Sequence, residues 1–100
     1  MGALYKANLI AVTPVGSVPD DLRPFIEFKA TLKKIALKRE QMVAIFLIET
    51  TECYIPVFLS AGLSIRSIKD ELAEQEAEMD IAAERVIGDV LSRISSEKKK

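Results

Sequence analysis

Seven consecutive apolar residues, Met42 to Ile48, are the feature of this 100-residue chain that most restricts its fold. A strand with apolar side chains on both faces of its pleat belongs in the centre of a sheet that is covered on both sides. Four polar residues follow, and strand-forming residues resume from Cys53 to Leu59. The two segments therefore predict a β-hairpin. Pro56 has no N–H to donate to a ladder, so the second arm is predicted to be an edge strand or to be bulged.

The residues before the hairpin give conflicting signals. Residues 3–12 have the composition of a largely buried strand. Over residues 24–41 the composition favours a helix, whereas alternating apolar and polar residues from Ile26 to Lys33 favour a strand. A helix would place Lys29 in the middle of its apolar face, which is unfavourable. We therefore predict a strand over residues 25–33 and a short irregular or helical piece to Gln41, with a helix as the alternative.

The C-terminal third is predicted to be helical. We expect two helices, at about residues 66–76 and 80–95, with a bend near residues 77–79. Ser64 or Ser67 is the expected N-cap of the first helix and Asp80 that of the second. One continuous helix is the alternative, because the intervening residues are good helix formers. The side chains expected to cover the sheet are Val86, Ile87, Val90 and Leu91.

Together these elements predict an α+β fold. About four mainly antiparallel strands would form a sheet packed against the C-terminal helices. We expect residues 1–95 to form a single α+β domain and residues 96–100 to form a disordered basic tail. The longest apolar run is far shorter than the roughly 20 residues that a membrane span requires. No membrane partner is therefore expected.

The residue inventory excludes several classes of chemistry. The chain has no histidine, and Cys53 is its single cysteine. Nucleophile–histidine pairs and zinc sites built from thiolates are therefore excluded. The glycines are too scattered for a phosphate-binding loop. We expect no enzymatic activity, no catalytic residue, no cofactor and no metal. Cys53 is predicted to be a small buried residue, and a lone thiol suits a cytoplasmic location.

Charge is segregated although the net charge is only −1. Residues 29–39, the basic block, carry no acid, and residues 70–84, the acidic block, carry no base. The candidate binding patch consists of Lys29, Lys33, Lys34, Lys38 and Arg39. Such a patch suits phosphates, but no Tyr or Trp is interleaved for base stacking. The two blocks are complementary, and they are expected to meet within one subunit or between subunits. Asp20 and Asp21 are interpreted as capping residues.

Several segments resemble a known family. Residues 18–29 (VPDDLRPFIEFK), Val43 to Phe46 and the two-part acidic C-terminal region are similar to a small archaeal family found in methanogens, the domain of unknown function 749. The family has no assigned active residues, so none is transferred. The resemblance implies an archaeal cytoplasmic protein without assigned chemistry.

The leading functional hypothesis is a non-enzymatic interaction module that forms a homo-oligomer or binds a protein partner. An exposed sheet edge or a leftover apolar helix surface would make the contact. The alternative is a nucleic-acid-binding domain that uses the basic segment 29–39. An enzyme using carboxylates and lysines around a ligand is the third hypothesis, and it requires a deep pocket with a desolvated lysine.

Overall fold

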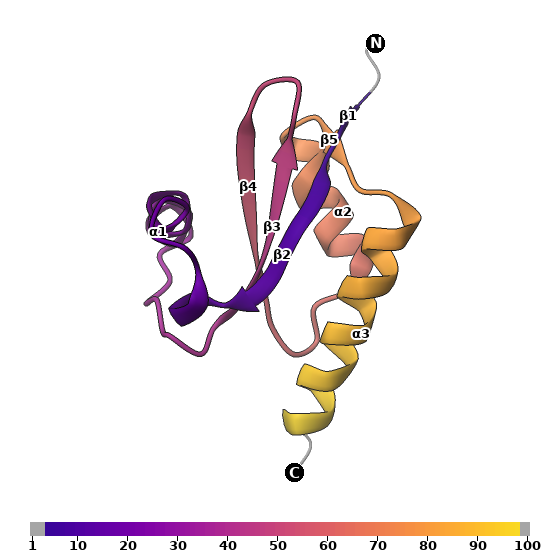
Figure 1. Ribbon diagram of the computed structural model, residues 1–100. Helices are drawn as coiled ribbons and strands as arrows, with labels where there is room; N and C mark the ends of the chain where they lie inside the picture. Colours follow the sequence, from indigo (N-terminus) through magenta and orange to yellow (C-terminus); the bar gives the residue numbers. More distant parts are fainter. Residues whose placement is uncertain (1–3, 99–100) are drawn as a thin grey trace.

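The computed structural model describes residues 4–98, which form the α+β fold expected from the sequence (Figure 1). The elements in chain order are β1 (Tyr5–Lys6), β2 (Asn8–Pro14), the 3-10 turn η1 (Val15–Ser17), α1 (Arg23–Lys33), β3 (Met42–Ile48), β4 (Cys53–Leu59), α2 (Ile65–Glu74), β5 (Ala77–Glu78) and α3 (Ile81–Lys98). Along residues 4–98, no helix is both long and apolar enough to cross a membrane.

The predicted hairpin is confirmed and forms most of the main sheet. Strand β3 lies in the centre and pairs antiparallel with β2 on one side and β4 on the other. The β3–β4 register runs without a shift from Met42 opposite Leu59 to Ile48 opposite Cys53. β4, the strand that contains Pro56, is an edge strand as predicted. The β2–β3 register shifts between Leu9 and Ala11.

A short parallel pair ties the N-terminal segment to the α2–α3 connection. β1 pairs with β5, and Tyr5 N–H donates to the Glu76 carbonyl at 2.7 Å. Ala7 N–H donates to the Glu78 carbonyl at 2.8 Å. The strand predicted over residues 3–12 is thus two strands, β1 and β2, and residue 3 lies outside the described residues.

The strand predicted over residues 25–33 is wrong, because this segment belongs to helix α1. Ile26 and Ala30 are buried on one face of the helix, four residues apart. Pro24 stands in the first turn, where a missing N–H costs nothing. Lys34 ends the helix in a left-handed conformation, φ 57°, and donates its N–H to the Thr31 carbonyl at 3.2 Å. The main sheet therefore has three strands, not about four.

The prediction of two C-terminal helices is confirmed. Ser64 caps α2 by accepting the Ser67 N–H at 3.1 Å. Asp80 precedes α3, and its Oδ1 accepts the Ala83 N–H at 2.9 Å. The bend expected at residues 77–79 is the site of β5. α3 continues to Lys98, past the expected start of the tail at residue 96, and residues 99–100 lie outside the described residues.

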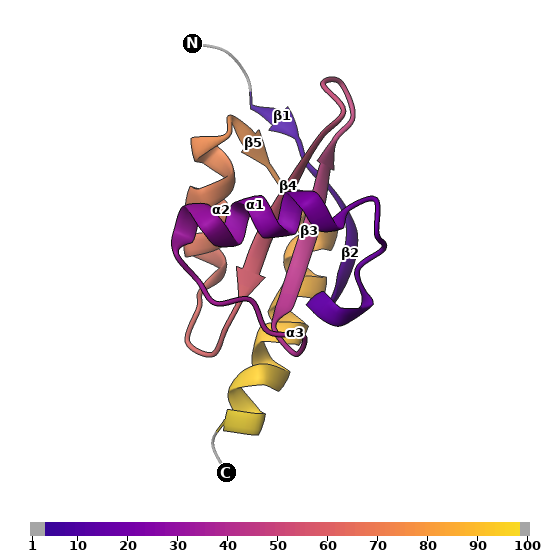
Figure 2. The ribbon, with the colours of Figure 1, turned by 90° about the vertical axis from the view of Figure 1, so that its left-hand side faces the viewer.

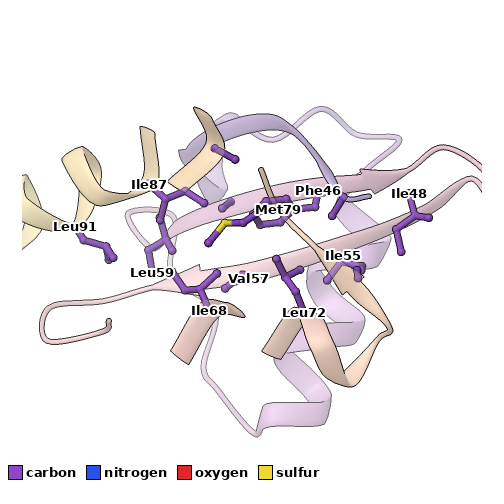
Figure 3. Packing of buried hydrophobic residues seen from close by; sticks show 14 residues of the cluster. Phe46, Ile48, Ile55, Val57, Leu59, Ile68, Leu72, Met79, Ile87 and Leu91 are labelled. Atoms are coloured by element: carbon purple, nitrogen blue, oxygen red, sulfur yellow. The ribbon is translucent and has the colours of Figure 1, made fainter. Parts of the chain in front are cut away.

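The helices cover both faces of the main sheet. α1 lies alone across one face, and α2 and α3 cover the other (Figures 1 and 2). The larger core lies between the sheet and α2 and α3, where Phe46 and Val57 meet Leu72 and Ile87 (Figure 3). The smaller core, on the α1 side, contains Val15, Val18, Ile26, Val43 and Ile45.

The prediction of which α3 side chains cover the sheet is correct in part. Ile87 and Leu91 are buried and Val90 is partly buried in the larger core. Val86 is 47% exposed, contrary to the prediction. Neighbouring residues of a helix point about 100° apart, so Val86 and Ile87 do not face the sheet together.

Candidate functional site

Helix α1 carries an exposed row of large apolar side chains, here called the apolar stripe. The stripe consists of Phe25, Phe28 and Leu32, with Phe28 65% and Leu32 63% exposed. Spacings of three and four residues place them along one side of the helix. Ile26 and Ala30 already pack against the sheet, so the stripe is additional to the face that the fold buries. Clustered exposed apolar residues of this kind mark contact surfaces more often than scattered ones.

A groove runs beside the apolar stripe, between α1 and the edge strand β4. Its volume is about 320 Å³, and it is lined by the stripe together with residues 53–56 of β4. The rings of Phe25 and Tyr54 contact each other across it, with centroids 5.1 Å apart and planes tilted by 52°. Lys29 and Gln75 also line the groove. The stripe and β4 therefore form one continuous, mostly apolar surface.

The edge of β4 is poorly suited to pairing with another strand. Pro56 in the middle of β4 lies opposite Ile45 and has no N–H. Proline on an edge strand is a common protection against edge-to-edge pairing. The side chains beside the edge thus offer a better contact than its backbone does.

Two lysines of the basic block contact one carboxylate of the acidic block within the chain. Lys29 Nζ lies 2.7 Å from Glu71 Oε2, and Lys33 Nζ lies 3.5 Å from Oε1. The Lys29 and Glu71 side chains are only 12% and 21% exposed. The contact between Lys29 and Glu71 is therefore a largely buried ion pair. It links α1 to α2 and neutralises part of the basic block.

The five residues of the predicted binding patch lie in different environments. Lys29 and Lys33 are engaged by Glu71, while Lys34, Lys38 and Arg39 are exposed at the end of α1 and in the following connection. The Arg39 carbonyl accepts the Gly16 N–H at 3.0 Å, which fixes this connection to η1. Cation density is therefore concentrated beyond the C-terminal end of α1.

A hollow larger than this groove lies elsewhere, beside α2 and the start of α3. It has a volume of about 460 Å³, and Lys69 and Glu84 on its wall form an ion pair at 3.0 Å. Arg66 and Asp70, also on its wall, approach to 3.9 Å and are both highly exposed. Lys69 is about half exposed, so it is not the desolvated lysine that the enzyme hypothesis requires.

Sequence reasoning missed the apolar stripe and two further features. The spacing of Phe25, Phe28 and Leu32 is the signal for the stripe, but the strand assigned to this segment concealed it. Cys53 is exposed, contrary to its predicted burial, because it begins β4 next to the turn. Asp20 is not a cap: α1 begins after Leu22 without a side-chain cap, and Asp20 instead approaches Arg23 at 3.7 Å.

A family model described as Domain of unknown function (DUF749) matches residues 5–91. The chain belongs to the DUF749 family. It is similar to the "Uncharacterized protein MJ0858" of Methanocaldococcus jannaschii, with 25% identity over 91 residues that cover 90% of this chain and 80% of that protein. No solved structure matches the chain. The DUF749 match extends from β1 into α3, so the apolar stripe, β4 and Glu71 all lie within the family region.

Proposed function

We propose that this DUF749 protein is a non-enzymatic interaction module that self-associates through the outer face of α1. The observation that carries the proposal is the apolar stripe, which stays exposed although the sheet beneath α1 is already covered. In Figure 2, α1 is the element nearest the viewer, and its outer side faces away from the sheet. Complete burial of one such side chain contributes about 1.5–3 kcal/mol, so a partner that covers Phe28 and Leu32 supplies a substantial driving force.

The surroundings of the stripe suit a protein partner better than nucleic acid. Apolar residues in the centre with charged residues at the rim are typical of protein interfaces. Lys29 and Lys33, next to the stripe, share the Glu71 carboxylate, which cancels about half of their positive charge. A single-stranded nucleic acid site combines unneutralised cations with stacking aromatics on the same groove. The other three cations of the patch, Lys34, Lys38 and Arg39, are exposed and lie beyond the stripe.

Sedimentation equilibrium over a range of protein concentrations tests the proposal. We expect wild-type protein to form dimers reversibly and Phe28→Glu to remain monomeric, because a carboxylate would be buried in the contact. Ile81→Glu is the matched control, since Ile81 is 73% exposed at the start of α3, away from the stripe. This control should dimerise like wild type.

The same variants separate the alternatives. Wild-type protein that stays monomeric up to roughly 1 mM, the weak end of specific association, contradicts the proposal. Equal effects of the two substitutions also contradict it, because they would show that any added surface charge disrupts association. Steeply salt-dependent binding of a labelled single-stranded RNA, lost in a Lys34→Glu, Lys38→Glu variant, would instead support the nucleic-acid function.

A further inference from the structure

The groove between α1 and β4 is bounded by carboxylates at one end. Cys53, the first residue of β4, and Gln75, the C-cap of α2, both line the groove. Glu52 comes directly before Cys53, and Glu74 and Glu76 flank Gln75 in the chain. All three glutamates are exposed. The apolar surface of the groove therefore ends at a group of negative charges.

Two further exposed glutamates extend this negative region. Glu49 lies in the turn between β3 and β4, and Glu78 lies in β5, at the same end of the sheet (Figures 1 and 2). The five residues together are here called the acidic end: Glu49, Glu52, Glu74, Glu76 and Glu78. None of them forms an ion pair with a lysine or arginine of residues 4–98. Lys6 lies opposite Glu78 in the β1–β5 register, but its Nζ approaches Asp80 at 4.0 Å.

The walls of the groove are mostly apolar and aromatic. The apolar stripe, Tyr54 and Ile55 form most of its lining. Lys29 is the cation among the lining residues, and the Glu71 carboxylate lies 2.7 Å from its Nζ. Pro56 makes the edge of β4 a poor partner for an added strand. A ligand in the groove is therefore held by side-chain contacts.

We infer that the groove binds a basic peptide segment of a partner protein. Its apolar side chains lie in the groove, and its lysines or arginines reach the acidic end. A small amine carries a single charge, whereas carboxylates distributed over a turn, the end of α2 and β5 complement several cations of one segment. Apolar contacts in the centre and charges at the rim are typical of protein interfaces. This binding does not require the proposed self-association.

Fluorescence anisotropy of short labelled peptides tests the inference. The first peptide has a pair of leucines among lysines. One control peptide has serines in place of the leucines, and the other has glutamates in place of the lysines. We expect the full chain to bind the first peptide with a dissociation constant on the order of 10–100 µM, and to bind each control peptide at least about 10-fold more weakly.

Neutral variants of the protein measure the contribution of the acidic end. Glu52→Gln, Glu74→Gln and Glu76→Gln combined should weaken binding of the leucine–lysine peptide about 10-fold at low salt, and the difference should shrink at high salt. The matched control neutralises three exposed acids outside the groove and its acidic end: Glu40→Gln, Asp70→Asn and Asp89→Asn. This control should bind the peptide within about twofold of wild type.

A second pair of variants measures the contribution of the apolar wall. Leu32→Ser removes an exposed side chain from the groove and should weaken peptide binding about 3- to 10-fold. Ile81→Ser, at a similarly exposed position at the start of α3, is its control and should have no effect. Circular dichroism and thermal unfolding confirm that each variant folds.

Several outcomes refute the inference. Equal binding of the serine–lysine peptide would show that charge alone attracts the peptide, and equal binding of the leucine–glutamate peptide would show that the acidic end has no role. Absence of binding to wild type also refutes it, and self-association that weakens in the triple glutamine variant would then assign the groove to a second copy. The proposed self-association is measured without peptide, so its test is independent of these results.

Discussion

Lys29 and Glu71 form an ion pair at 2.7 Å that joins α1, on one face of the sheet, to α2 on the other. Both helices contact β4, so the pair forms at the side of the sheet where β4 is the outer strand. Lys33 adds a second cation at 3.5 Å from the same carboxylate. This ion pair helps to position α1, and α1 carries the apolar stripe on its outer side.

Glu71→Gln should destabilise the fold by about 1–3 kcal/mol, because Lys29 would keep its charge in a largely buried position without a compensating anion. Asp70→Asn is the matched control. Its partner Arg66 lies 3.9 Å away and both side chains are highly exposed, so a loss of about 0–0.5 kcal/mol is expected. Urea denaturation followed by circular dichroism measures both. Equal losses of stability in the two variants would show that the Lys29–Glu71 ion pair contributes no more than an exposed ion pair does.

The sequence alone was sufficient to predict the elements that are determined by residues close together in the chain. The continuous apolar run from Met42 to Ile48 requires burial on both faces, and β3 has that environment. The boundary between α2 and α3 follows from capping chemistry, because Asp80 bonds the backbone three residues later. Both features depend on residues close together in the chain, which is why they were predictable.

Helix α1 was mispredicted because the anion that meets Lys29 is distant in the sequence. Lys29 is unfavourable on the inner side of a helix unless an anion meets it, and Glu71 lies 42 positions further along the chain. The segregation of charge into two blocks indicated that they would meet, but not which residues would pair. Without that pairing, the alternation around Ile26 suggested a strand, and the apolar stripe was not recognised.

Ile87→Ala should cost about 2–5 kcal/mol, because it leaves a cavity in the larger core where Ile87 is fully buried. The neighbouring Val86 offers a control on the same helix turn. Val86→Ala removes a half-exposed side chain and should cost about 0.5 kcal/mol or less. Chemical denaturation of the two variants gives the comparison. Similar losses would mean that α3 packs on the sheet with a different face.

Asp80→Ala should destabilise the protein by about 1 kcal/mol through loss of the cap on α3. Asp80 also approaches Lys6 at 4.0 Å, so the substitution removes two contacts at once. Asp80→Asn separates them, since an asparagine oxygen still accepts the Ala83 N–H but carries no charge. We expect Asp80→Asn to retain nearly all the stability in thermal unfolding. A loss as large as that of the alanine variant would assign the effect to the ion pair.

Two glycines should respond to alanine in opposite directions. Gly88 lies within α3, and a Cβ added there meets no atom within 4 Å, so Gly88→Ala should stabilise the fold by about 0.5–1 kcal/mol. Gly62 has φ +86° in the turn where Leu63 N–H donates to the Ser60 carbonyl at 3.2 Å. This turn requires a positive φ at its third residue, so Gly62→Ala should cost about 1–2 kcal/mol although space is available. Thermal and urea unfolding of both variants measure whether each substitution raises or lowers the stability of the fold. A stabilising Gly62→Ala would contradict the backbone conformation assigned to the turn between β4 and α2.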